Sequence, residues 1–118
     1  MLNVQRKNIG NVSLLNLDGN VLIGETDSLR DIMQALPLTT SVILDLSQVA
    51  LVDAHGLGVL LQLREQALAR GIQLELMNVT DHLRDLFRMT HLDSVFQIRA
   101  GAELFPLLAT AHQTRVAA

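Results

Sequence analysis

The chain of 118 residues contains no cysteine, tryptophan or tyrosine, and its only aromatic residues are three phenylalanines. The absence of cysteine excludes disulfides, thiolate metal sites, iron–sulfur clusters and a cysteine nucleophile. The scarcity of aromatic rings argues against base stacking as a way to bind single strands. The net charge of −3, with Lys7 as the single lysine, provides no basic field for phosphate backbones. We therefore expect no nucleic-acid partner.

A long apolar run is also missing, although 49% of the residues are hydrophobic and the mean hydropathy is +0.32. No apolar stretch approaches the roughly 20 residues that span a bilayer. The first residues carry Arg6 and Lys7 with no apolar segment after them, unlike a targeting signal. We expect a single cytoplasmic domain over residues 1–118 that does not insert into membranes. Such an apolar chain must bury most of its aliphatic side chains or present some to a partner.

Hydrophobic periodicity predicts strands that alternate with helices. The expected strands are Leu2–Lys7, Val12–Leu17, Val42–Leu46, Ile72–Leu76 and Val95–Ile98, with a further short one at Val21–Ile23 left open. The expected helices are Thr26–Leu36, His55–Arg70, Thr80–Met89 and Gly101–Gln113. The first two strands lie close enough in the sequence to form an antiparallel pair, whereas later strands need crossover connections. This order predicts an α/β fold with a largely parallel sheet.

Several side chains have a predicted orientation or end an element. Strict alternation places Glu75 on the solvent side of its strand, and Leu74 on the core side. Proline disfavours the helical conformation of the residue before it, so Pro37 ends the first helix. Gly71 is the expected left-handed residue after the second helix. The apolar stripe predicted for that second helix consists of Leu57, Leu60, Leu61, Leu63, Ala67 and Leu68.

Motifs typical of enzymes are not found in the sequence. It has neither a G-x-S-x-G elbow nor a Walker A loop, and Gly56-Leu57-Gly58 is only a fragment of a dinucleotide motif because Leu61 stands at its last position. The four histidines include no i,i+4 pair that would suggest a metal site. Asp81 and Asp85 alternate with arginines along a helix, which is typical of a solvated face. We expect no catalytic activity, no cofactor and no bound metal.

The segment from Asp45 to Leu61 is the most distinctive part of the chain. A buried strand is followed by Asp53, which can cap a helix whose first turn contains Gly56 and Gly58. Glycine there lowers helix propensity. It either permits close approach of another chain or permits tight packing of the helix on the sheet. The sequence leaves both readings open.

This segment resembles the signature of the STAS domain family, the fold of anti-sigma factor antagonists, in which D-L-S-x-x-x-x-x-D-S-S-G-L-G-x-L joins a strand to a helix. Two further stretches are similar to family motifs: Leu17–Val21 to an L-x-G-E-L-D turn, and Leu86–Leu92 to an L-F-x-x-[ST]-G-L stretch. The resemblance covers about Val4 to Ala111. It implies a STAS-like α/β fold, with a mixed, mostly parallel sheet of four to five strands and about four helices mainly on one side.

The resemblance also implies a protein-interaction domain and not an enzyme. In partner-switching members, the unphosphorylated domain binds an anti-sigma factor or GHKL-type serine kinase and thereby frees a sigma factor. Phosphorylation of the serine after the motif aspartate ends that complex, since it adds charge and bulk. Here Ala54 occupies the phospho-acceptor position, so this switch cannot operate at residue 54. The implied partner-binding residues are Asp53, Ala54, His55, Gly56, Leu57, Asn20 and Met89, with Leu57 left open to pack inward instead.

Other departures from the family pattern concern regulation more than fold. His55 replaces the second serine, Asn20 replaces a glutamate, Leu22 an acidic residue and His91 a glycine. His55 is either a tolerated surface replacement or a contact sensitive to pH or phosphate. The hydroxyl groups of Ser47, Thr80 and Thr90 are interpreted as caps or turn residues.

Three alternatives stay open. The first alternative is a STAS subunit of a lipid or anion transporter complex, and a stressosome-like scaffold is a further candidate. The start of the helix at Ala54–Leu57 could also accept the phosphate of a nucleotide. For oligomeric state, we expect a monomer or a homodimer.

Overall fold

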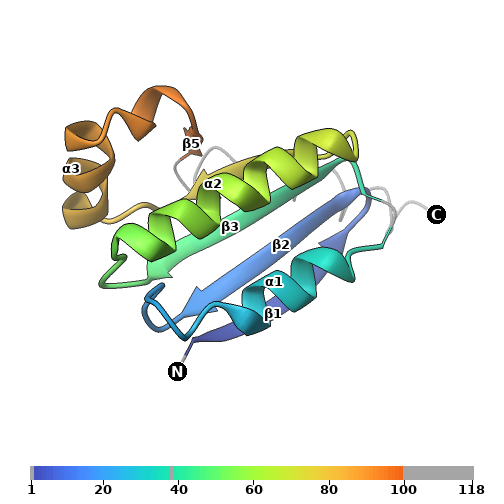
Figure 1. The fold of residues 1–118 in the computed structure, drawn as a ribbon. Coiled ribbons are helices and arrows are strands. Elements are labelled where there is room, and N and C mark those ends of the chain that lie inside the picture. Colours follow the sequence, from blue (N-terminus) through green and yellow to red (C-terminus); the bar gives the residue numbers. More distant parts are fainter. Residues whose placement is uncertain (1, 38, 100–118) are drawn as a thin grey trace.

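A computed structural model describes residues 2–37 and 39–99 of the chain. Its sheet contains five strands in the order β1-β2-β3-β4-β5, and Figure 1 shows them side by side. The strands are β1 (Asn3–Ile9), β2 (Val12–Asp18), β3 (Ser41–Gln48), β4 (Gln73–Met77) and β5 (Gln97–Arg99). Only β1 and β2 pair antiparallel, and the other three pairs are parallel. The predicted mixed, mostly parallel sheet is confirmed.

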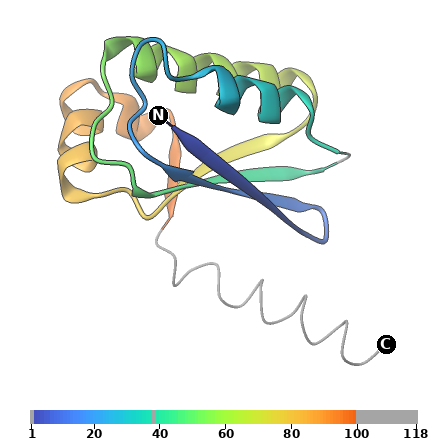
Figure 2. The same ribbon diagram turned by 90° about the horizontal axis from the view of Figure 1, so that it is seen from below.

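The helices alternate with the strands, as predicted. They are α1 (Asp27–Gln34), α2 (Ala54–Ala69) and α3 (Asp81–Met89), followed by the short 3₁₀ helix η1 (Leu92–Ser94). Figures 1 and 2 show α1 and α2 side by side on one face of the sheet, with α3 at the end of the molecule where α2 begins. The fourth predicted helix, Gly101–Gln113, lies outside the described residues.

Strand β3 forms the centre of the fold because it is apolar on both of its faces. Successive side chains of a strand point to opposite sides of the sheet. Val42 and Leu44 therefore face the helices, where they are fully buried in the main core. Ile43 points to the other side and is buried beside Met77 in a second, smaller cluster. A strand buried on both faces was predicted from this run of residues.

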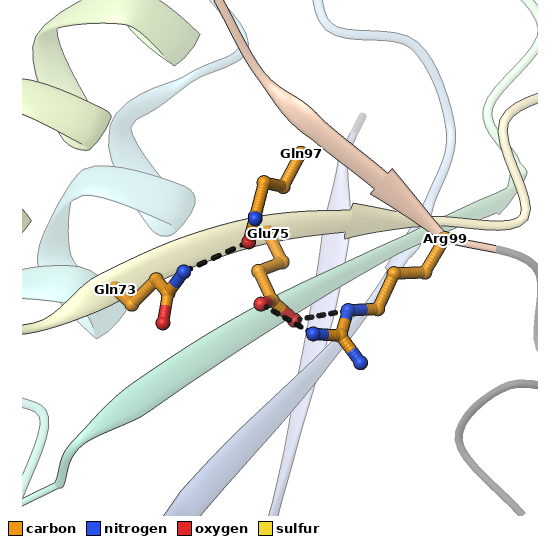
Figure 3. Close-up of polar contacts among 4 residues, drawn as sticks. All are labelled: Gln73, Glu75, Gln97 and Arg99. Carbon is orange, nitrogen blue, oxygen red and sulfur yellow. Dashed lines mark hydrogen bonds and ion pairs between the residues drawn. The ribbon is translucent and has the colours of Figure 1, made fainter.

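Glu75 on β4 corrects a prediction. Its expected place was in solvent, yet only 4% of the residue is exposed. Arg99 of the neighbouring strand β5 forms an ion pair with it, with 2.9 Å between Nε and Oε2, and Gln73 bonds Gln97 beside it (Figure 3). Alternation predicted correctly that Glu75 points away from Leu74, but it could not show that Arg99 would cover it.

Helix α2 buries a slightly different stripe from the one predicted. Val59, Leu60, Leu63 and Ala67 are buried, whereas Leu68 is 51% exposed. Consecutive residues of a helix lie about 100° apart, so the turn that buries Ala67 carries Leu68 away from the sheet. The prediction of Leu68 as a core residue was therefore wrong, and Val59 was missed.

The predicted end of α2 is confirmed. Gly71 has φ +73°, a left-handed conformation that favours glycine. The N–H of Gly71 donates to the carbonyl of Leu68, and the N–H of Ile72 donates to that of Ala67. This pair of bonds is the Schellman motif, which satisfies carbonyl groups that the end of a helix leaves free.

Some element boundaries differ from the prediction. Helix α1 ends at Gln34, before Leu36, and Thr26 at its N-cap makes no side-chain capping bond. Strand β5 starts at Gln97 and not at Val95, because the N–H groups of Val95 and Phe96 both donate to the carbonyl of Leu92 in the turn that follows η1. These shifts leave the order of the elements unchanged.

Candidate functional site

The candidate site is the junction where the chain passes from β3 into α2, beside the loop that follows β2. Val21 donates its N–H to the carbonyl of Leu51 (3.0 Å) and accepts from the N–H of Asp53 (3.3 Å). These bonds accompany a single parallel bridge between Val21 and Val52, which is all that forms of the strand left open at Val21–Ile23. Two segments thirty residues apart are thereby joined into one surface.

Asp53 fixes the start of α2 to this loop. One carboxylate oxygen accepts from the N–H of Gly56 at 2.7 Å, which is the predicted helix cap. The other accepts from the N–H of Ile23 at 3.0 Å. These N–H groups, that of Ile23 first, hold the pKa of the Asp53 carboxyl below its usual range. The negatively charged carboxylate thus stabilises both the helix start and the neighbouring loop.

Asn20 has a similar internal role on the other side of the bridge. Its side-chain oxygen accepts from the N–H of Leu51 at 3.1 Å. Asn20 is half-buried, and so is Asp53. Both residues were predicted to bind a partner, and the structure shows that each is engaged in shaping the junction.

The two glycines of α2 differ in their surroundings. The sequence left open whether they permit tight packing of the helix or close approach of another chain. Gly56 is buried, and a Cβ atom at this position would overlap the carbonyl group of Val21. A Cβ atom at Gly58 would meet nothing within 4 Å. Gly56 therefore permits tight packing of the helix on the loop, whereas Gly58 leaves space on the helix surface.

The outer surface of the junction combines small and aliphatic side chains. Ala54 and His55 are exposed, and Leu57 is half-buried against the main core. Ile23 is 70% exposed and Leu51 is 50% exposed, although neither was predicted to belong to the site. Ile23 lies in the loop after β2 and Leu51 in the loop between β3 and α2, but Val21, Val49 and Val52 of the same loops are buried, so the sequence carries no signal that separates the exposed residues from the buried ones.

Met89 lies apart from this junction, on α3. It is 79% exposed, the highest value among the exposed large hydrophobic residues of the described chain. Figure 1 shows α3 at the end of the molecule where α2 begins. The structure thus brings six of the predicted residues, Asn20 and Asp53–Leu57, into the junction and places Met89 on a neighbouring element.

Two of the hydroxyl groups are caps, as predicted. The Thr80 hydroxyl accepts from the N–H of Leu83 at the start of α3, and the Thr90 hydroxyl donates to the carbonyl of Leu86 at its end. The next residue, His91, has φ +60°, a left-handed conformation that is uncommon outside glycine. The glycine of the resembled motif would fit this backbone, so the replacement changes the residue and keeps the turn.

Within residues 2–37 and 39–99, no group of three or more His, Cys, Asp or Glu side chains is placed to hold a metal ion. None of the helices described in that part of the chain has the length and apolar character needed to cross a membrane.

Comparison with known proteins identifies the family of the chain and solved structures with the same fold. The family model described as STAS domain matches residues 3–111. A sulfate transporter family protein from Wolinella succinogenes superposes with a TM-score of 0.75 at 19% identity, covering 91% of this chain and 93% of the other. An anti-sigma factor antagonist from Mycobacterium paratuberculosis gives 0.73 at 18%, covering 97% and 93%.

A third solved structure is the Bacillus cell fate determinant SpoIIAA in its phosphorylated form. It superposes with a TM-score of 0.67 at 15% identity, covering 90% of this chain and 99% of the other. At such low sequence identities the likeness shows a shared fold alone.

Proposed function

The chain belongs to the STAS domain family, and we propose that it is a protein-binding domain of the anti-sigma factor antagonist type that cannot be switched off at residue 54. One observation carries the proposal. Ala54 is exposed at the start of α2, in the same junction as the exposed aliphatic side chains of Ile23 and Leu51. The surface has the composition of a docking site and lacks the hydroxyl that a kinase would modify there.

The internal bonds of the junction support this role. Exposed aliphatic side chains contribute to binding when a partner removes them from water, by about 25 cal/mol per Å². Binding is weakened when side chains and loops must first become ordered. The bonds of Asp53 and Asn20 hold the junction in place before any partner arrives. A phosphate at residue 54 would instead place a charge of about −1.5 to −2 in this surface.

We propose that the role is binding and not catalysis, in the cytoplasm, as a monomer or homodimer. Both carboxylate oxygens of Asp53 accept backbone hydrogen bonds, so the residue is poorly suited to act as a base. The expected partner is an anti-sigma factor or a GHKL-type serine kinase.

Affinity capture from the source cell tests the proposal. The tagged chain should recover an anti-sigma factor or GHKL-type kinase, and the purified pair should bind in calorimetry. Ala54→Glu should weaken this binding at least about tenfold, because it mimics the charge of a phosphate. An acidic residue at a helix start is favourable, so this variant should fold. Ala69→Glu, at the exposed far end of α2, is the matched control and should bind normally.

A second arm restores the missing hydroxyl. With the recovered kinase and ATP, Ala54→Ser should be phosphorylated at residue 54, whereas substantial labelling of the unmodified chain elsewhere would contradict a domain that cannot be switched. Recovery of neither partner class, or normal binding by Ala54→Glu, would reject the proposal.

A transporter role is the second candidate, since the sulfate transporter family protein has the same fold. The neighbouring genes separate the two roles: a permease and an ATPase favour transport, and a sigma factor and a kinase favour regulation. Capture of a membrane transporter would also replace the first proposal. Large, defined assemblies in size-exclusion chromatography would point to a stressosome-like scaffold.

A further inference from the structure

A groove of about 230 Å³ lies between α1 and α2, next to the junction. Figures 1 and 2 show the two helices side by side on the same face of the sheet. The groove is lined by Arg30 of α1 and by His55, Gly58, Val59 and Gln62 of α2. His55 is shared with the junction, so a protein that covers Ala54 also reaches the groove.

Arg30 is the distinctive group in this groove. Its Nε atom is shielded from solvent and has no hydrogen-bond partner within the described part of the chain. A shielded donor without a partner costs free energy, about 1–3 kcal/mol in typical proteins, and such groups call for a physical explanation. No incoming acceptor can reach this N–H while the side chain keeps this conformation, so a ligand in the groove must meet the Nη end of the guanidinium, which forms no hydrogen bond or ion pair within the described residues.

The other lining residues fit a small acceptor group. A Cβ atom at Gly58 would meet nothing within 4 Å, so the helix surface is open at that point. Val59 is buried and presents an apolar floor, while Gln62 adds an exposed amide that can donate. A guanidinium group matches the planar geometry of a carboxylate, to which it can donate two parallel hydrogen bonds.

We propose that this groove receives the carboxylate of an Asp or Glu side chain from the protein partner, with Arg30 as its principal contact. The inference rests on the proposed function, because it names the chemistry that the partner should present beside Ala54. Docking would pair the positive charge of Arg30 through its Nη atoms. The partner surface should therefore be aliphatic opposite Ile23 and Leu51, and acidic opposite Arg30.

An experiment on the isolated chain tests the groove without the partner. Sodium acetate serves as the carboxylate probe, and sodium chloride of equal ionic strength is the control. In nitrogen-15 NMR, acetate should shift the Nε–Hε signal of Arg30 and the side-chain amide of Gln62 in a saturable way. Arg30→Gln should remove the response of Gln62. Equal shifts with acetate and chloride, or none, would overturn the proposal.

Charge reversal in the complex tests the role of the groove in docking. Arg30→Glu should weaken binding of the captured partner by at least about tenfold, and Arg30→Lys should weaken it less. Lys7→Glu is the matched control, since Lys7 is exposed on β1 and undergoes the same change of charge.

The outcomes separate this inference from the proposed function. If Ala54→Glu loses the partner while Arg30→Glu retains it, the proposed function stands and the groove proposal fails. If no partner of the expected class is found, the proposed function fails, and the acetate titration alone decides whether Arg30 binds carboxylates. If inorganic phosphate shifts the Arg30 signal and acetate does not, the groove is a phosphate site and the proposal is wrong.

Discussion

Helices α2 and α3 have similar ends but differ in how they are joined to the rest of the molecule. Each begins with a side-chain cap, Asp53 for α2 and Thr80 for α3. Each is followed by a residue in the left-handed conformation, Gly71 and His91 respectively. A charged and a neutral side chain thus cap the two helix starts in the same way, and a glycine and a histidine adopt the same left-handed conformation after the two helix ends.

The difference lies at the two starts. The Thr80 hydroxyl accepts from Leu83, within its own helix, whereas the Asp53 carboxylate also accepts from Ile23 in a distant loop. Gly56 brings that same loop against the first turn of α2. The start of α3 therefore depends on a hydrogen bond within its own helix. The start of α2 also depends on contacts with a distant loop, and these contacts form the candidate site.

The largest loss of stability is expected when a side chain is added between α2 and the loop that follows β2. Gly56→Ala would push a methyl group into the carbonyl of Val21 and should lower the free energy of unfolding by about 3 kcal/mol or more. Gly58→Ala is the matched control, because its methyl group has free space and alanine favours helix by up to about 1 kcal/mol. Urea unfolding measures both. Equal effects of the two substitutions would show that the contact at Gly56 does not constrain the fold.

Removing the Asp53 cap should destabilise the protein more than removing the Thr80 cap. Thr80→Ala removes one local hydrogen bond and should cost about 1 kcal/mol. Asp53→Ala removes two, one of them to the loop, so its urea midpoint should fall further. Amide hydrogen exchange at Ile23 should accelerate in Asp53→Ala and stay unchanged in Thr80→Ala. Equal midpoints for the two variants would argue that Asp53, like Thr80, acts only within its helix.

The two helix ends should respond with opposite signs. Gly71→Ala forces a side chain into the left-handed region and should destabilise the protein by about 1–2 kcal/mol. His91→Gly relieves the same strain and should stabilise it by somewhat less, about 0.5–1 kcal/mol, since glycine also gains freedom in the unfolded chain. Thermal or urea unfolding distinguishes the signs. A loss of stability in His91→Gly would mean that the imidazole contributes a contact that outweighs the strain.

The features that were predicted correctly depend on residues close together in the sequence. The Asp53 cap joins two residues that are only three apart in the sequence, Asp53 and Gly56, and Gly71 lies directly after the last turn of its helix. The order of strands and helices follows from periodicity within each segment. Such signals do not depend on the tertiary structure, which is why the fold class and the capped start of α2 could both be predicted.

The features that were missed depend on distant residues. Glu75 is buried because Arg99, 24 residues later, forms an ion pair with it. Asn20 shapes the junction because the N–H of Leu51, 31 residues away, lies beside it. Ile23 and Leu51 are exposed because nothing in the described chain covers them, which periodicity within one segment cannot show. The sequence therefore predicted a candidate site at the start of α2 but not the aliphatic side chains on the surface of the junction.

The smallest expected effect is a pH dependence that separates the starts of α2 and α3. The pKa of Asp53 is lowered in the folded chain by the N–H groups of Ile23 and Gly56, whereas its unfolded value is about 3.9. Its stabilising contribution is therefore fully present above about pH 3.9 and disappears as the pH falls through the lower folded pKa. Asp53→Asn keeps an uncharged acceptor, so the difference in urea midpoint between the unmodified chain and this variant should be constant at about pH 5–6 and should shrink as the pH falls below about 3.9. The Thr80→Ala difference should stay constant, because a hydroxyl does not titrate in this range. A constant Asp53→Asn difference would show that the carboxylate charge adds nothing to the hydrogen bonds at the start of α2.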